Sequence, residues 1–121
     1  MAELHESVLV NCRNKFVKKG WHEHKTPIHG YRPDLFIQRF SKEDRVIEEI
    51  ILEAEIQSTL HTDHTAEQLG YIHEYIVRQT KKKIIVKGFL AIPKGKKVLT
   101  IAEMFLYSQF PGDDTIKIIQ I

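Results

Sequence analysis

Three carboxylates interrupt apolar runs of this sequence at positions where an acid is costly. Asp34 opens the run RPDLFI, and Glu53 and Glu55 lie two residues apart within IILEAEIQST. Each carboxylate resists burial unless its charge is compensated. A Mg²⁺ or Mn²⁺ ion would compensate all three, because these ions bind carboxylate, carbonyl and water oxygens. Such an ion lowers the pKa of a bound water and stabilises the charge that develops when a phosphodiester is hydrolysed.

The elements around these acids predict that they meet at one end of a sheet. Residues 33–40 and 46–56 both read as strands, and the polar stretch 41–45 is short enough to join them as a hairpin. In that hairpin, Asp34 lies opposite residues 51–55. Because strand side chains alternate between faces, one face carries a set of acids and one isoleucine, namely Glu49, Ile51, Glu53 and Glu55. The carbonyl of Ala54 or Ile56 is placed to add a ligand.

The rest of the chain predicts one α/β domain over residues 1–121, with a mixed sheet flanked by helices. The expected elements are a helix at 4–19, an extended segment at 21–28, the hairpin, a helix at 63–80, a strand at 84–92 buried on both faces, a helix at 100–110 and a final strand at 115–121. This order predicts an antiparallel meander followed by a crossover helix into a further strand.

Composition narrows the functional classes. The chain has 121 residues, 42% hydrophobic and 28% charged, and a net charge of +2, which is too small to indicate nucleic acid by itself. The single Cys12 excludes an internal disulfide and fits a reducing compartment. We expect a cytoplasmic protein, since the N-terminus lacks a signal-peptide pattern and no apolar run is long enough to span a membrane.

The lysines form three short clusters, while acids concentrate between Glu43 and Glu67. The clusters are Lys18–Lys19, Lys81–Lys83 and the group Lys94, Lys96 and Lys97. A basic rim around an acidic centre predicts electrostatic steering of a polyanion. The alternative is that these lysines follow helix ends, where the helix dipole favours them, and only maintain solubility.

The letters RPDLF followed by EAE resemble the PD-(D/E)xK nuclease superfamily. The resemblance implies a restriction-endonuclease-like αβββαβ core, here followed by one more helix and strand. It implies that Asp34 and Glu53 bind Mg²⁺ or Mn²⁺, and that Glu55 stands where a Lys usually orients or activates the attacking water. Some restriction enzymes are similar in using Glu there. A Glu can ligate metal or accept a proton, but it cannot stabilise an anion as Lys does.

A second stretch carries the same resemblance. EQLGYIHEYI, residues 67–76, resembles the Gln-and-Tyr helix of the RecB-like and Holliday-junction-resolvase-like branches. It implies that Gln68 points into the site; the usual Tyr position is Ile72 here, and Tyr71 lies one residue earlier. Many members supply another acid from the first helix, for which Glu6 is the first candidate and Glu3 the second.

Each candidate also has a structural interpretation. Asp34 would suit the start of a strand beside a turn, and Glu53 and Glu55 would suit the solvent face of an edge strand. Gln68 would form a capping box with Thr65, unless the cap of that helix is Thr62 or Asp63.

The seven histidines raise a zinc interpretation through His22-x-His24 and through His61-x-x-His64 with Asp63. A zinc site needs three or four convergent ligands. We therefore favour His61 and His64 as loop residues that contact phosphate or carry a proton, or as surface residues without a role.

These patterns predict a divalent-metal-dependent endonuclease or exonuclease that hydrolyses DNA phosphodiester bonds. The domain has no room for a sequence-reading module, which favours structure-specific cleavage of branched or single-stranded DNA. We expect a homodimer through residues 99–121, where Phe105, Tyr107 and Phe110 belong to the core or to the dimer face. The alternatives are a catalytically inactive nuclease-fold domain that binds nucleic acid or protein, and an interaction module whose acidic face binds a basic partner.

Overall fold

The five strands form one sheet in which spatial order follows chain order, β1-β2-β3-β4-β5. The computed structural model describes residues 2–25, 27, 30–60 and 62–121. Its elements are α1 (Ala2–Phe16), β1 (Trp21–Glu23), β2 (Leu35–Phe40), β3 (Val46–Ala54), α2 (Asp63–Thr80), β4 (Ile85–Ile92), α3 (Lys96–Gln109) and β5 (Ile116–Gln120). Strands β1 to β3 are antiparallel, and β4 and β5 continue the sheet in parallel. The molecule is thus a small α/β domain with a mixed sheet, as predicted.

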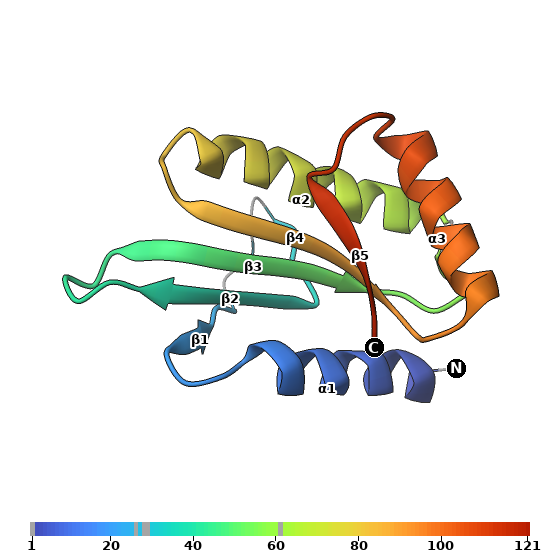
Figure 1. Cartoon of the computed structure of the whole chain (residues 1–121), viewed down its shortest axis with the longest axis horizontal. Coiled ribbons are helices and arrows are strands. Elements are labelled where there is room, and N and C mark those ends of the chain that lie inside the picture. The colour runs from blue at the N-terminus through green and yellow to red at the C-terminus, as the bar shows by residue number, and fades with distance from the viewer. Residues whose placement is uncertain (1, 26, 28–29, 61) are drawn as a thin grey trace.

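Helices cover both faces of this sheet (Figure 1). On one face, Val8 and Cys12 of α1 pack against β2 and β3 residues such as Leu35 and Leu52. On the other face, α2 and α3 share a core with Ile51 of β3. The two opposed cores explain why residues 50–52 of β3 are apolar on both faces, and why the buried acid that follows them, Glu53, is costly. Among the described residues, no helix is long and apolar enough to cross a membrane.

The hairpin of β2 and β3 agrees with the predicted register. Leu35 pairs with Leu52 and Ile37 with Ile50, with an irregularity between Arg39 and Phe40. Extending this pairing by one residue sets Asp34 opposite Glu53. The predicted alternation is also correct, since Ile51 and the even-numbered residues of β3 lie in different cores.

Several predicted boundaries differ from the structure. Helix α1 ends at Phe16 rather than residue 19, and the extended segment yields only the three residues of β1. Helix α3 begins at Lys96 rather than residue 100, after Gly95 with φ 152°. The stretch PKGKK carries two helix-breaking residue types and no apolar periodicity, which is why it reads as a turn. Strand β4 is buried only over its second half, since Ile85 is exposed.

A buried carboxylate fixes α2 to the sheet. Glu49 of β3 is fully buried. Its Oε1 accepts a hydrogen bond from Gln79 Nε2 at 2.7 Å, and Tyr75 donates to Oε2 at 2.8 Å. From β2, Gln38 Nε2 donates to Oε2 at 2.8 Å. Three elements therefore meet on one side chain, which fixes the second half of α2 to the first half of β3.

We expect Glu49→Ala to lower the free energy of unfolding by about 3 kcal/mol, because it removes the carboxylate that accepts from both the partly buried Tyr75 hydroxyl and the buried Gln79 amide. Denaturant unfolding measures this difference. The matched control is Glu43→Ala in the exposed hairpin turn, which should change stability by less than about 0.5 kcal/mol. Equal effects of the two substitutions would contradict the assigned role of Glu49.

Candidate functional site

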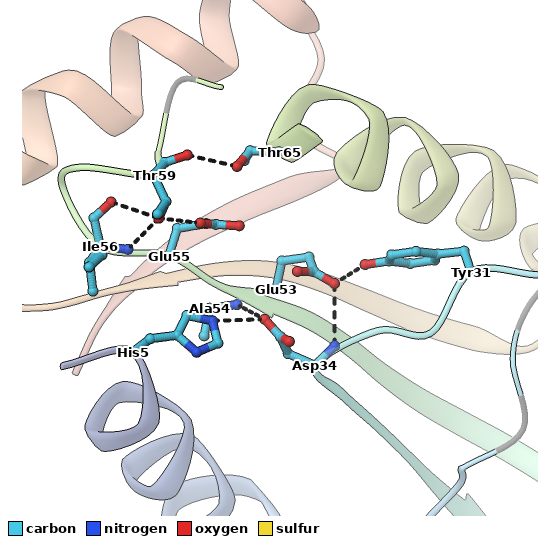
Figure 2. Close-up of polar contacts among 9 residues, drawn as sticks. All are labelled: His5, Tyr31, Asp34, Glu53, Ala54, Glu55, Ile56, Thr59 and Thr65. Carbon is cyan, nitrogen blue, oxygen red and sulfur yellow. Dashed lines mark hydrogen bonds and ion pairs between the residues drawn. The ribbon is translucent and has the colours of Figure 1, made fainter. Parts of the chain in front are cut away.

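Asp34 and Glu53 are held together by the backbone of the hairpin. The Asp34 side chain accepts a hydrogen bond at Oδ2 from the backbone N–H of Ala54, at 2.9 Å. In return, Glu53 Oε1 lies 3.3 Å from the backbone nitrogen of Asp34, which donates to it. Figure 2 shows the Glu53 carboxylate lying between Asp34 and the ring of Tyr31. The predicted convergence of these two acids is therefore observed, at the carboxyl end of β3.

Glu53 is a buried acid whose charge is poorly compensated. Its side chain is 1% exposed, and the Tyr31 hydroxyl donates a hydrogen bond to Oε1. Burial raises the pKa of Glu53 to about 8; the Asp34 N–H opposes this rise, and the charge of Glu55 adds to it. Near neutral pH, this carboxyl group holds a proton unless a cation replaces it. The interpretation of Glu53 as a solvent-facing edge residue is wrong.

Glu55 follows β3 and is also buried. Its backbone N–H donates to the carbonyl of Ala91, which continues the sheet by one residue. The carboxylate turns towards Thr59, whose hydroxyl donates to Oε2 at 2.5 Å (Figure 2). Burial raises the pKa of Glu55, hydrogen bonds from Thr59 and Thr65 lower it, and the charge of Asp34 raises it again. We call Asp34, Glu53 and Glu55 the carboxylate cluster.

Helix α1 contributes a histidine to the cluster. His5 Nε2 lies 3.5 Å from Asp34 Oδ2, and the two side chains are both partly exposed. The predicted candidate Glu6 lies on the same turn but is exposed. The side chain of Glu3 lies outside the described residues. Sequence reasoning missed His5 because it looked for a further acid in this helix.

Tyr31 and Gln68 extend the site on the α2 side. Both line a cavity of about 400 Å³. The Oε1 atom of Gln68 is buried and has no hydrogen-bond partner within the described part of the chain. The capping alternative for Gln68 is wrong, because Thr62 is the N-cap of α2 and accepts from the N–H of Thr65. Gln68 therefore lies beside the cluster with its amide oxygen unused.

The same end of the sheet receives the starts of all three helices (Figure 1). The positive ends of the α1 and α2 dipoles thus lie near the cluster, which favours an anionic ligand. The lysine clusters are divided. Lys94, Lys96 and Lys97 flank the start of α3 at this end, whereas Lys81–Lys83 follow α2 and Lys18–Lys19 follow α1 at the far end. One of the three lysine clusters therefore lies at the end of the sheet that holds the carboxylate cluster.

The residues present fit a hard divalent cation in their chemistry. Mg²⁺ usually takes one or two protein carboxylates and keeps several waters. Asp34 and Glu53 supply two carboxylates. Burial is the largest cause of the raised pKa values of Glu53 and Glu55, the charge of Glu55 adds to the first and that of Asp34 to the second, and a cation would offset both effects. In the described part of the chain, however, no three or more His, Cys, Asp or Glu side chains already converge on one point as a ligand set.

The described members of the predicted histidine pairs have different surroundings. His22 packs edge-on against Phe40, and the ring of His24 lies 5.1 Å from that of Phe36. His64 is exposed at the start of α2, and His61 lies outside the described residues. Of the seven histidines, His5 is the one that contacts the carboxylate cluster within the described residues.

Comparison with known proteins adds no relative, since no family model, no curated protein and no solved structure matches this chain.

Proposed function

We propose that the protein is a divalent-metal-dependent nuclease that hydrolyses DNA phosphodiester bonds, built on the restriction-endonuclease-like core of the PD-(D/E)xK superfamily. One observation carries the proposal. Two buried acids, Glu53 and Glu55, lie with Asp34 at the end of a central strand, and burial raises the pKa of both glutamates, with a smaller contribution from the charge of Glu55 on Glu53 and of Asp34 on Glu55. A fold seldom retains such a costly arrangement without a function for it.

Each residue has a separate role in this proposal. Asp34 and Glu53 bind Mg²⁺ or Mn²⁺, which when bound supplies Lewis acidity and a water of lowered pKa. The Tyr31 hydroxyl orients Glu53 through its hydrogen bond. Glu55 binds the metal or accepts the proton of the attacking water, with Thr59 fixing its carboxylate. His5 positions Asp34 from α1. Glu6, exposed on α1, is a weaker candidate for a further metal ligand.

The second candidate function is a catalytically inactive nuclease-fold domain that binds nucleic acid or a protein. One observation favours it: Glu55 replaces the usual Lys and already has a partner in Thr59. In that case the carboxylate cluster would bind at most a cation, and phosphodiester cleavage would not occur.

Partner and location complete the proposal. The substrate is DNA with branched or single-stranded structure, and the chain acts as a homodimer through α3 and β5. Met104 and Tyr107 of α3 are highly exposed apolar residues, whereas Phe105 is in the core and Phe110 stacks on His73. We assign the protein to the cytoplasm, where the buried Cys12 thiol, whose pKa is raised by burial to about 11, would stay reduced.

The direct test is a cleavage assay on plasmid, branched and single-stranded DNA with Mg²⁺, with Mn²⁺ and with a chelator. We expect cleavage of at least one structured substrate in either metal and none with the chelator. Absence of cleavage on all substrates, combined with salt-dependent DNA binding, would instead support the inactive binding domain.

A further inference from the structure

The cavity that Tyr31 and Gln68 line adjoins the carboxylate cluster. Tyr31 belongs to both, since its hydroxyl donates to Glu53 while the residue lines the cavity. The volume of about 400 Å³ is within the range of small-ligand sites. The side chain of Tyr31 therefore separates a group in this cavity from the Glu53 carboxylate. A substrate chain with its reacting unit at the carboxylate cluster could place the next unit in the cavity.

Two aromatic rings form one wall. Tyr31 and Tyr71 stack with ring centroids 5.2 Å apart and an angle of 13° between their planes. Tyr31 is 8% exposed, whereas Tyr71 is 37% exposed. The buried Tyr31 ring thus stacks on the more exposed Tyr71 ring, and both residues contribute an aromatic platform to the cavity lining. Such platforms stack nucleobases at about 1–3 kcal/mol per base.

The polar groups of the cavity differ in burial. Gln68 offers a buried amide oxygen that has no hydrogen-bond partner among the described residues. An unmet buried acceptor is costly, so a ligand donor that reached this atom would be favoured. The mouth carries the exposed cationic or ionisable side chains of Arg32 and His64. The one acid in the lining, Glu67, accepts a hydrogen bond from Tyr71 at 3.5 Å.

We propose that this cavity holds one unpaired nucleobase of the strand whose phosphodiester lies at the carboxylate cluster. The base stacks on Tyr71, an N–H on its edge donates to Gln68, and the adjoining phosphate contacts Arg32. A base inside a continuous duplex cannot enter, because both its faces and its pairing edge are occupied. The substrate class is therefore single-stranded, frayed or branched DNA. This inference rests on the proposed function, since it places the reacting phosphate at the cluster.

The test is fluorescence anisotropy of a short single-stranded DNA, the same sequence as a blunt duplex, and the same strand with one abasic position. The protein carries Asp34→Asn so that no strand is cut during the measurement. We expect the single strand to bind at least about ten-fold more tightly than the duplex. Tyr71→Ala should weaken single-strand binding about ten-fold, which corresponds to about 1.4 kcal/mol of lost stacking. When the abasic site occupies the nucleotide that enters the cavity, the parent protein should lose about the same affinity as Tyr71→Ala loses for the intact strand. Tyr71→Ala should bind the abasic strand no more weakly than it binds the intact strand, because both changes remove the same stacking contact.

Two matched variants make the measurement specific. Phe40→Ala removes an aromatic ring of β2 that is 38% exposed, close to the 37% of Tyr71, and it should leave single-strand affinity unchanged. Tyr71→Phe retains the ring and should bind as tightly as the parent. Because Tyr71 is partly exposed, its Ala variant should remain folded, which thermal unfolding checks. Gln68→Met, of similar size but without the amide, should alter the preference among the four bases.

The outcomes separate this inference from the nuclease proposal. If DNA is cut by the wild type but Tyr71→Ala and the abasic strand leave affinity unchanged, the base cavity is refuted while the nuclease proposal stands. If nothing is cut yet single-strand binding depends on Tyr71, the nuclease proposal fails and the nucleotide site is supported. If a free nucleoside monophosphate competes as strongly as the strand, the occupant is a free nucleotide and the inference is overturned.

Discussion

Asp34→Asn and Glu53→Gln will each lower the rate of metal-dependent DNA cleavage by about 100- to 1000-fold while leaving the protein folded. Each variant keeps the shape of the side chain but removes the negative charge that would hold the metal. Both substitutions should disturb the structure little, because an amide oxygen still accepts the hydrogen bonds that Ala54 and Tyr31 donate to these two side chains. The measurement is the initial cleavage rate at saturating Mg²⁺, with circular dichroism as the check of folding.

Glu48→Gln is the control for that experiment. Glu48 lies on the same strand, and its carboxylate pairs with Arg39 at 2.9 Å and with Lys87 at 3.2 Å. Glu48 is the same residue type as Glu53 but lies outside the carboxylate cluster. Its replacement should therefore leave the cleavage rate within about two-fold of the wild type. Loss of cleavage in all three variants would show that general charge matters more than the cluster. Full activity in Asp34→Asn and Glu53→Gln would remove the basis for the nuclease proposal.

The hairpin and its acids were predictable because two simple periodicities act over a short chain segment. Alternation along β3 assigns Glu53 to the same face as Ile51, and a short turn sets the register that brings Asp34 opposite Glu53. Helix α2 was equally predictable, since its N-cap at Thr62 and its apolar stripe are both local signals. Elements whose signals lie within one short segment of the chain can therefore be predicted from the sequence.

The partners of these acids were not predictable, because they come from distant parts of the chain. His5 reaches Asp34 from α1, and Tyr31 reaches Glu53 from a loop that carries no periodic signal. Glu49 shows the same limit. Alternation assigns it to the α2 face, but only packing shows that side chains of α2 satisfy it there. The acids on and just after β3 thus differ: Glu48 and Glu49 have compensating partners, whereas burial raises the pKa of Glu53 and Glu55, and tertiary contacts decide this difference.

Glu53 and Glu55, with their raised pKa values, make stability depend on pH in a direction unusual for a carboxylate. The pKa of Glu53 is about 8 in the folded protein and about 4.5 without its surroundings. Below pH 4.5 both states hold the proton, and stability is at its full value with respect to this group. Between pH 4.5 and 8 the unfolded chain ionises while the folded protein does not, so stability falls by up to about 1.4 kcal/mol per pH unit. Above pH 8 the loss is complete.

We therefore expect Glu53→Gln to be more stable than the wild type at about pH 8 by a few kcal/mol, and the difference to shrink towards about pH 4.5. Glu55, whose pKa is also raised, will leave a weaker slope of the same sign in the variant. Denaturant unfolding of both proteins over this pH range measures the two slopes. Equal slopes of unfolding free energy against pH in the two proteins would mean that Glu53 ionises in the folded protein as easily as in the unfolded chain. That result would contradict the raised pKa of Glu53.

Divalent metal should reverse the effect in the wild type alone. A cation that binds the ionised cluster of the folded state stabilises it by RT ln(1 + [L]/Kd), about 2.7 kcal/mol at a concentration about 100 times Kd. At about pH 8, adding Mg²⁺ or Mn²⁺ should raise the unfolding free energy of the wild type and leave Glu53→Gln nearly unchanged. Ca²⁺ should act similarly, because it also binds carboxylate oxygen, whereas an equal ionic strength of Na⁺ should not. An equal gain in unfolding free energy for the wild type and Glu53→Gln would show that the metal binds away from Glu53. Any DNA cleavage that depends on the carboxylate cluster would then have to be explained without a metal bound to Glu53.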